Sequence, residues 1–340
     1  MKGKMINILV TGAGGGVGQG IIKSIKLIDD LDINVIAADM SPLASGLYGG
    51  DEAILVPAAS ASDYFDVISQ ICVENNINYY FPGTDVELLK AADFSSELYQ
   101  KCQTETAVCP KDVIEIADDK YSTYKFLVDN GFDAPNTRFP NDVDLNNLHY
   151  PIIIKPRVGC RSIGVYKVNN AQEAKNAIDS VDGPVIQEYL DGDEFTCTVV
   201  AVKDKISDVL CLKRDLRAGD TYRAFPEKNT VIESYVKALA LKLGIYGSCN
   251  FQLRLDDGVP KLFEINSRFS GTTPFCAQLG FNPVEFYLKA QLNMPYESDI
   301  NYDAMVLRHW TEVVVSKSIL NEKTIAKPFK VESLKVSSMI

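Results

Sequence analysis

The sequence predicts two successive parts, a doubly wound α/β domain and a mixed α+β second half. Three observations predict them. Short apolar strands alternate with helical patterns near the N-terminus, a Gly-rich turn follows the first strand, and a polar hairpin stands late in the chain. A length of 340 residues is too great for one small core and suits two or three packed units.

The first domain, expected over residues 1–112, alternates strands and helices. Strands are expected at 6–10, 33–39 and 77–81, with helices from about residue 21 and near 62–75. Strand, helix, strand, helix, strand is the order of a doubly wound parallel sheet.

In the second half we expect a small unit at 113–190, a larger unit at 191–320, and a tail or packed extension at 321–340. In the small unit we expect helices at 120–130 and 171–180 and strands at 152–155 and 185–190. In the larger unit we expect strands at 195–203 and 208–213, a helix at 230–243 and a hairpin at 249–266.

Composition argues against several classes of protein. The net charge of −11 disfavours nonspecific binding to nucleic acid or to anionic membranes. No run of about 18 apolar residues and no signal peptide is visible, so we expect a cytoplasmic protein without a membrane partner. The eight cysteines form no Cys-x-x-Cys pair and are expected to be reduced thiols, and two histidines are too few for a His-based zinc site or a Ser-His-Asp triad.

The Gly-rich turn at 12–18 allows three interpretations. It fits Thr-Gly-x-x-x-Gly-x-Gly, which resembles the short-chain dehydrogenase pattern, and Asp39 stands where a ribose-binding acid would be. Tyr121 and Lys125 match the spacing of that family's catalytic pair, but Val108 occupies the place of its upstream serine. The other two interpretations are a tight turn that binds no dinucleotide and a site for an anionic substrate group.

A lysine stands at the end of the strand expected at 152–155. Lys155 runs into a Gly-bearing loop at 157–165. A strand-end lysine beside such backbone suits the oxygens of a triphosphate, although a solvated surface lysine is equally compatible with this segment alone. No P-loop motif is present.

Two acidic residues follow the strand at 185–190. Glu188 ends this apolar strand and is a candidate acceptor for an adenine amino group, with the following backbone pairing with the ring. Glu194 is a candidate acceptor for ribose hydroxyls. An exposed acidic turn is the alternative.

The late hairpin carries the most informative pattern. Alternation places Glu264 and Asn266 on one face, and places Phe263 and Ile265 in a core. A five-residue loop would set Gln252 opposite Glu264. We therefore expect three oxygen-bearing side chains to converge on one face.

Such a cluster suits magnesium, which takes oxygen ligands with few protein carboxylates and completes its shell with phosphates and water. Arg268 follows directly and is suited to neutralising charge on a transferring phosphoryl group. A solvated polar face is the alternative, but it gives no reason for an uncharged Gln252 opposite the Glu-x-Asn-x-Arg run.

Taken together, these segments resemble the ATP-grasp superfamily. More narrowly, the chain is similar to one half of the carbamoyl-phosphate synthase large subunit, as a stand-alone protein, from about residue 5 to 300. The motifs stand in the family's order: Asp119-Lys120, Ile154-Lys155-Pro156, the Gly159–Gly164 loop, Glu188-Tyr189-Leu190, Glu194, Gln252, and Glu264-Ile265-Asn266-Ser267-Arg268.

The resemblance implies a Rossmann-like pre-ATP-grasp domain followed by a two-part ATP-grasp fold. It implies ATP and Mg²⁺ as cofactors and a lid formed by the Gly159–Gly164 loop. The implied ATP-binding residues are Lys120, Lys155, Gly159, Ser162, Gly164, Glu188, Tyr189, Leu190 and Glu194. The implied ligands of one or two magnesium ions are Gln252, Glu264 and Asn266, with Arg268 and Lys155 as catalytic residues.

The sequence departs from the family pattern at three positions. Ser267 stands where proline is frequent, and Arg161 adds a charge to the lid loop at a position that is usually small. Gln252 replaces the acid of many members, as in carbamoyl-phosphate synthases, which leaves the metal cluster one formal carboxylate.

The implied function is ATP-dependent ligation of a carboxylate to an amine. Arg214, Arg217 and Arg223 are candidates for the substrate carboxylate, or are surface charges. Asp85 and Glu87 are candidates for an amine, or cap the following helix. The expected partners are small molecules only, with a homodimer left open. The alternatives are carbamate or bicarbonate chemistry, a nicotinamide-dependent reductase, and a silent nucleotide-binding scaffold.

Overall fold

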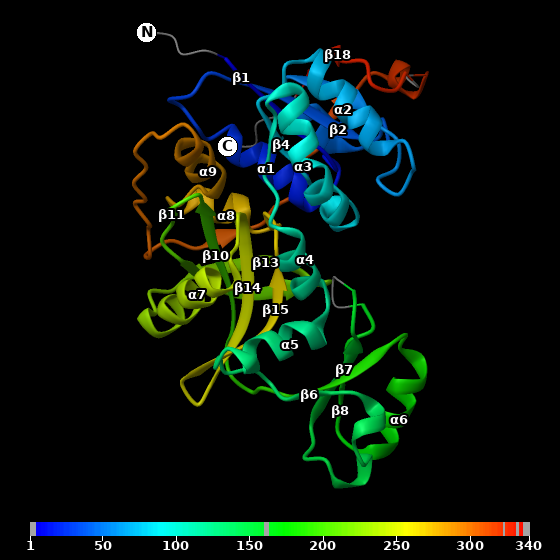
Figure 1. The fold of residues 1–340 in the computed structure, drawn as a ribbon, viewed down its shortest axis with the longest axis vertical. Coiled ribbons are helices and arrows are strands. Elements are labelled where there is room, and N and C mark those ends of the chain that lie inside the picture. The colour runs from blue at the N-terminus through cyan, green and yellow to red at the C-terminus, as the bar shows by residue number, and fades with distance from the viewer. Residues whose placement is uncertain (1–4, 160–162, 322–323, 331–332, 336–340) are drawn as a thin grey trace.

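The computed structural model describes residues 5–159, 163–321, 324–330 and 333–335. Three main β-sheets follow one another along the long axis of the molecule (Figure 1). The N-terminal sheet lies at one end, a small four-stranded sheet at the other, and a large antiparallel sheet between them. This mixed α/β arrangement confirms the predicted fold class.

The N-terminal sheet has the strand order β18-β3-β2-β1-β4-β5, in which only β18 is antiparallel to its neighbour. Its consecutive strands are β1 (Ile6–Val10), β2 (Ile33–Asp39), β3 (Glu52–Leu55), β4 (Tyr79–Phe81) and β5 (Glu105–Thr106). Its helices are α1 (Gly16–Ile25), α2 (Tyr64–Glu74) and α3 (Leu88–Cys102), with short 3-10 turns at Ser45–Gly49 and Asp85–Glu87. Strand β3 was not predicted, so the strand expected third, at 77–81, corresponds to β4.

The small sheet is antiparallel, in the order β6-β9-β7-β8. Its elements are β6 (Thr137–Arg138), β7 (Ile152–Pro156), β8 (Tyr166–Val168), α6 (Ala171–Ser180) and β9 (Pro184–Glu188), with 3-10 turns at Pro140–Asp142 and Leu145–Asn147. Ile152, Ile154 and Ile186 pack against Ala174 and Ala177 of α6 in a core of their own. This sheet can therefore be regarded as a separate packing unit.

The large sheet has the order β15-β14-β10-β12-β13-β16, with β11 beside β10. The strands are β10 (Glu194–Val202), β11 (Lys205–Ile206), β12 (Leu210–Arg217), β13 (Asp220–Pro226), β14 (Gly247–Asp256), β15 (Val259–Asn266) and β16 (Val306–Leu307). Helices α4 (Lys111–Asp118), α5 (Lys120–Asp129) and α7 (Thr230–Leu243) pack against β15. Helices α8 (Thr273–Gln278) and α9 (Pro283–Gln291) pack against α1, which joins this sheet to the N-terminal one.

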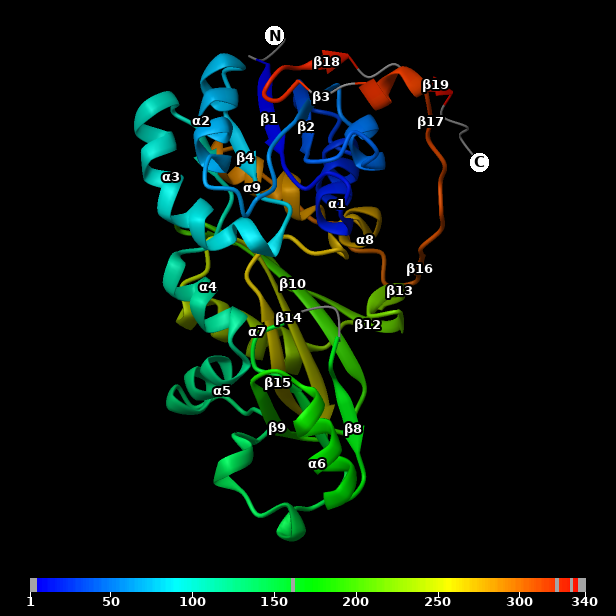
Figure 2. The ribbon, with the colours of Figure 1, turned by 90° about the vertical axis from the view of Figure 1, so that its right-hand side faces the viewer.

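The C-terminal segment returns to the N-terminal sheet (Figure 2). Strand β18 (Phe329–Lys330) pairs with β3, and the amide of Ala326 donates to the carbonyl of Leu55 at 2.9 Å. A second short ladder joins β17 (Val314–Val315) to β19 (Ser333–Lys335), and a 3-10 turn covers Lys317–Asn321. The described part of the expected tail is therefore a packed extension.

Within the described ranges, no helix combines the length and the apolar character needed to cross a membrane.

Candidate active site

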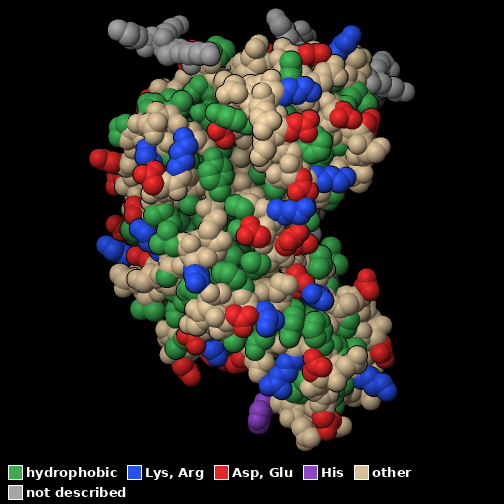
Figure 3. Space-filling model, viewed as in Figure 1, with side chains coloured by type: hydrophobic (Ala, Val, Ile, Leu, Met, Phe, Trp, Pro, Cys, Tyr) green, Lys and Arg blue, Asp and Glu red, His purple; other side chains and the backbone are tan. Residues whose placement is uncertain are grey.

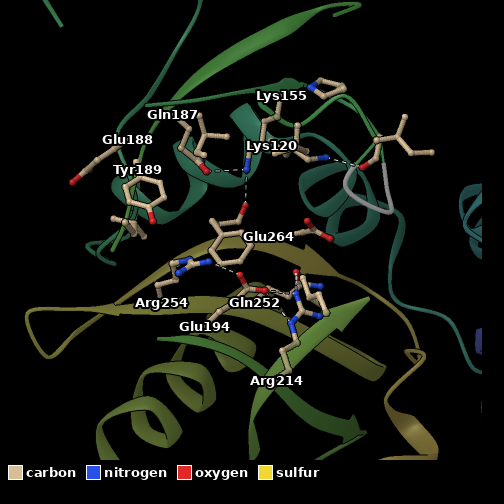
Figure 4. Close-up of a pocket in the computed structure, with 18 residues that line it drawn as sticks. Lys120, Lys155, Gln187, Glu188, Tyr189, Glu194, Arg214, Gln252, Arg254 and Glu264 are labelled. Carbon is tan, nitrogen blue, oxygen red and sulfur yellow. Dashed lines mark hydrogen bonds and ion pairs between the residues drawn. The ribbon is translucent and has the colours of Figure 1, made fainter. Parts of the chain in front are cut away.

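A cleft opens between the small sheet and the large sheet (Figure 4). Its walls come from β7 and β9 on one side and from β10, β12, β14 and β15 on the other. The structure brings together here these residues singled out by sequence: Lys120, Lys155, Gly159, Glu188, Tyr189, Leu190, Glu194, Arg214, Gln252 and Glu264. Figure 3 shows the surface hollowed between the N-terminal domain and the small sheet, with charges of both signs on the walls.

Two lysines approach the cleft from different elements. The Lys155 ammonium, at the end of β7, donates to Gln187 Oε1 at 2.8 Å and to the carbonyl of Phe263 at 3.4 Å. The Lys120 ammonium, at the start of α5, donates to the carbonyl of Gly159 at 2.7 Å. Both cations are therefore held by neutral acceptors, which leaves their charge available to an anionic ligand.

Burial strongly perturbs Lys155, which is 4% exposed. Desolvation lowers the pKa of its ammonium to about 7, an effect that the nearby Glu264 opposes and Lys120 reinforces. The charge on Lys155 is thus finely balanced near neutral pH, and a polyanion in the cleft would favour the protonated form.

The end of β9 forms the opposite side of the cleft. Glu188 accepts from the amide of Asn136 at 3.0 Å and from Lys261 Nζ at 3.2 Å, and its carboxylate points away from the centre of the cleft (Figure 4). The backbone from Glu188 to Leu190 nevertheless lines the cleft. Apolar wall atoms come from Ile153, Ile163, Val165, Leu216 and Phe263. Apolar walls with backbone groups at the edge suit a flat heteroaromatic ring.

Two arginines hold Glu194. Arg214 Nη2 donates to its Oε1 at 2.6 Å, and Arg254 Nη2 donates to its Oε2 at 2.8 Å. Arg214 also donates to Gln252 Oε1 at 2.8 Å. Arg214, which we expected to contact a substrate carboxylate, therefore lies within the cleft beside the expected ribose and metal residues.

The hairpin of β14 and β15 places Gln252 opposite Glu264, as predicted. The reason given for this pairing was wrong. The turn consists of Asp257 and Gly258, both at positive φ, and it is a two-residue turn rather than a five-residue loop. A register shift between Gln252 and Leu253 restores the pairing.

The same irregularity changes the position of Phe263. We expected Phe263 in a core, but it is half-buried and lines the cleft next to Glu264. A β-bulge inserts one extra residue and re-aims the side chains around it, so strict alternation fails at this point. Ile265 lies in the core as expected.

The polar cluster continues beyond the cleft toward the N-terminal domain. Asn266 Nδ2 donates to Glu264 Oε1 at 3.1 Å, and Arg268 Nη2 donates to Asn266 Oδ1 at 3.2 Å. Arg268 also forms an ion pair with Asp85, which follows β4. Asn266, Arg268 and Asp85 therefore form a polar chain that leads from the cleft to the edge of the N-terminal sheet.

The oxygen set supplies only part of the coordination shell of magnesium. Among the residues described, no three His, Cys, Asp or Glu side chains gather to hold a metal ion. What the cleft offers is the Glu264 carboxylate with the Gln252 amide opposite it, whereas Asn266 turns its amide nitrogen toward Glu264 and its oxygen toward Arg268. Magnesium held by few protein oxygens takes the rest of its shell from phosphate oxygens and water.

Several predicted residues lie outside the cleft lining. Arg217 is exposed near the end of β12, with its guanidinium 5.4 Å from the ring centre of Tyr222. Arg223 is exposed and pairs with Asp215 at 3.6 Å. Gly164 lies beside Pro156, since an added Cβ at Gly164 would be 3.1 Å from the ring of Pro156. Ser162 and Arg161 lie outside the described residues.

Glu87 is a helix cap, one of the two interpretations given for it. It is fully buried and accepts from the amides of Gly83 and Thr84, each at 2.9 Å. The hydroxyls of Tyr64 and Tyr80 each donate to it at 2.6 Å. These donors satisfy the carboxylate and separate it from any ligand in the cleft.

The Gly-rich turn is closed by its own packing. Asp39 accepts from the amides of Gly14 at 2.8 Å and Ser41 at 3.1 Å. A Cβ on Gly46 would lie 1.7 Å from the carbonyl of Ala13, so a neighbouring loop covers the turn. Tyr121 and Lys125 lie on α5, which packs against the large sheet. This separation gives no support to the reductase interpretation.

Sequence reasoning missed three polar or aromatic contributors, Gln187, Arg254 and Phe263. A signal existed for Arg254, which stands two residues after Gln252 on one strand and so shares its face. No local pattern identifies Gln187, because its contact with Lys155 depends on the pairing of β7 with β9.

Two family models match consecutive parts of the chain. Residues 117–272 match the ATP-grasp domain model, and residues 8–104 match that of the PylC-like N-terminal domain. A carbamoyl phosphate synthase large chain from Clostridium botulinum is 24% identical over 329 residues, which cover 86% of this chain and 30% of the synthase. The chain spans less than a third of the length of the curated synthases that it matches.

Solved structures show the same fold. The L-amino acid ligase from Bacillus licheniformis superimposes with a TM-score of 0.65 at 18% identity, covering 86% of this chain and 75% of the ligase. The N5-carboxyaminoimidazole synthetase from Staphylococcus aureus, complexed with ADP, has a TM-score of 0.69 at 15% identity, covering 88% and 80% of the two chains. Matched in this order, the two models show that the chain has a PylC-like N-terminal domain followed by an ATP-grasp domain.

Proposed function

We propose that the chain is an ATP-dependent ligase that activates a carboxylate as an acyl phosphate and transfers the acyl group to an amine. One observation carries this proposal: a single cleft joins the cations of Lys120 and Lys155 to the Glu264 cluster. Cations on one wall and oxygen ligands on the other suit a triphosphate with its metal.

Within this proposal, the residues divide between nucleotide and phosphoryl roles. The backbone after Glu188 and the apolar walls hold the base, and Lys120 and Lys155 hold phosphate oxygens. Glu264 is the central ligand for Mg²⁺, which when bound would neutralise charge on the phosphoryl group. Preorganised cations cost no reorganisation as that charge develops.

The substrate end is proposed at the edge of the N-terminal sheet, where Arg268 meets Asp85. A substrate carboxylate oxygen attacks the γ-phosphorus and ADP leaves; the amine then attacks the acyl carbon, phosphate leaves, and a proton is released. In this proposal Arg268 stabilises the phosphoryl charge and Asp85 contacts the amine. Arg217 is exposed and lies over the ring of Tyr222, so its position does not support a contact with the substrate.

A second candidate is carbonyl-phosphate or carbamate chemistry on bicarbonate. It is favoured by the similarity to carbamoyl phosphate synthase large chains, which extends over 86% of this chain. The two candidates share the nucleotide cleft and differ only in the acid that is phosphorylated.

One assay separates them. Purified protein is incubated with Mg-ATP and a panel of carboxylates and amines, with hydroxylamine to trap acyl phosphates, while ADP and phosphate are measured. Carboxylate-dependent hydroxamate supports the ligase, and bicarbonate-dependent ADP release supports the second candidate. ADP release that depends on neither a carboxylate nor bicarbonate would contradict both candidates.

Replacing Glu264 or Arg268 with alanine tests the assigned roles. We expect each change to lower kcat by about 10²–10³, as for the loss of a charge-stabilising group. Steady-state turnover at saturating Mg-ATP measures this, with the exposed Arg223→Ala as the matched arginine control. Wild-type turnover in either cleft variant would remove that residue from the mechanism.

A further inference from the structure

The Arg214 guanidinium sits between two oxygen-bearing side chains of the cleft (Figure 4). A single nitrogen, Nη2, donates to Glu194 Oε1 at 2.6 Å and to Gln252 Oε1 at 2.8 Å. Nε donates to the same oxygen of Glu194 at 3.0 Å, and Nη1 to Thr221 Oγ1 at 3.4 Å. The side chain is 9% exposed, so this cation is both buried and anchored at three of its nitrogens.

Gln252 has only one atom able to ligate a metal, its amide oxygen, since the amide nitrogen is a donor. That oxygen already accepts a hydrogen bond from Arg214, which uses one of its two lone pairs. A guanidinium does not lose its proton in proteins, so a permanent positive charge lies where a metal ion would have to approach.

The other candidate metal ligand, Glu264, has different hydrogen-bond partners. The hydrogen bond described for the Glu264 carboxylate comes from the neutral amide of Asn266 at 3.1 Å. Arg268, which contacts Asn266 at 3.2 Å, is directed toward Asp85 of the N-terminal domain and has no contact with Glu264 among those described. The two halves of the cleft therefore differ. At Gln252 a guanidinium contacts the candidate ligand oxygen directly, whereas the Lys155 ammonium near Glu264 bonds to Gln187 and to the carbonyl of Phe263.

We propose that Arg214 takes the place of a metal ion at Gln252, so that any metal bound with the nucleotide is confined to the Glu264 side. This inference rests on the proposed function, because it narrows the metal ligands suggested there. Arg214 becomes a positioning residue, which fixes Glu194 and Gln252 by filling the space between their oxygens.

The test is Mn²⁺ binding to the full-length protein without nucleotide, followed by the electron paramagnetic resonance signal of free Mn²⁺. In Arg214→Met the oxygens of Glu194 and Gln252 lose the cation between them. We expect this variant to bind Mn²⁺ about tenfold more tightly than the wild type. In Arg214→Met with Gln252→Met, the gain should disappear.

Arg254→Met is the matched control. Arg254 pairs with the same carboxylate, Glu194, at 2.8 Å, but makes no described contact with Gln252. Its loss removes an equal charge, and we expect no gain in Mn²⁺ affinity. Arg214→Gln serves if the methionine variant does not fold, as judged by thermal unfolding.

Mn²⁺ affinity unchanged in both folded Arg214 variants would overturn the proposal. An equal gain in Arg254→Met would also overturn it, because it would show a general charge effect. The measurement needs no carboxylate, amine or turnover. A failed hydroxamate assay therefore bears on the proposed function alone.

Discussion

Lys155 shows, at the scale of one residue, what sequence predicts and what it does not. Its place at a strand end followed from the apolar run before it, and β7 confirms that strand. Its burial and its bond to Gln187 arise from the pairing of β7 with β9 and the approach of β15. The local sequence pattern predicts neither the packing of the sheets nor the desolvation of Lys155. The lowered pKa of Lys155 could therefore not be predicted from sequence.

The lowered pKa of Lys155 predicts proton uptake on nucleotide binding. Burial holds the free-protein pKa near 7, so above pH 7 the group is mostly neutral, while bound phosphates favour its charged form. Affinity for ATP should therefore fall from pH 7 to pH 9, by up to about tenfold per unit.

Calorimetry in buffers of different ionisation enthalpy measures this uptake directly. Lys155→Met should bind more weakly and lose this component of the uptake. Equal proton uptake by the wild type and Lys155→Met would show that another group is responsible.

At the scale of elements, the β14–β15 hairpin was predicted well in outcome and poorly in detail. Glu264 faces Gln252, yet a two-residue turn and a bulge produce that register. Bulges depend on packing against neighbouring strands and leave little trace in a single sequence. For a similar reason β3, only four residues long, was missed, whereas the longer patterns of α6 and α7 gave their bounds correctly.

The bulge places Phe263 in the wall of the cleft, and its proposed contact with the nucleotide can be tested. Phe263→Ala removes a ring that lines the cleft, and we expect ATP to bind about tenfold more weakly, within the range for an aromatic contact to a base. Equilibrium titration with a fluorescent ATP analogue provides the measurement.

Phe225→Ala is the control for this change, because Phe225 lies on β13 of the same sheet and is 36% exposed outside the cleft lining. If both variants bound the analogue as well as the wild type, the aromatic wall would contribute nothing.

At the scale of the whole molecule, the N-terminal and large sheets share two hydrophobic cores, while the small sheet has its own. Sequence predicted the order of these units but not how they pack. The contact between the N-terminal domain and the large sheet includes Gly20 of α1, where an added Cβ would lie 3.0 Å from Pro274 of α8. In the sequence this glycine follows the Gly-rich turn at 12–18, and no local pattern there indicates its contact with α8.

Enlarging Gly20 should therefore disturb the relation between the domains. In Gly20→Leu the side chain would force α1 from α8 and shift Asp85 relative to Arg268. We expect kcat of the proposed ligation to fall about tenfold or more, as for small misplacements of catalytic groups, with ATP affinity little changed.

Gly16→Leu is the control on the same helix, since a Cβ there meets nothing within 4 Å. Steady-state kinetics and nucleotide titration separate the two effects. Parallel losses in both glycine variants would point to the helix itself rather than to the domain contact.

The return of β18 to the N-terminal sheet has a mechanical consequence. Strands β1 and β18 belong to one sheet, three strand spacings apart, or about 14 Å. Tension applied at residues 6 and 330 would act first on that sheet. The ATP-grasp portion of the chain between them would bear no load until a strand detached. Anchored in this way, the cleft between the small and large sheets is shielded from force transmitted along the chain.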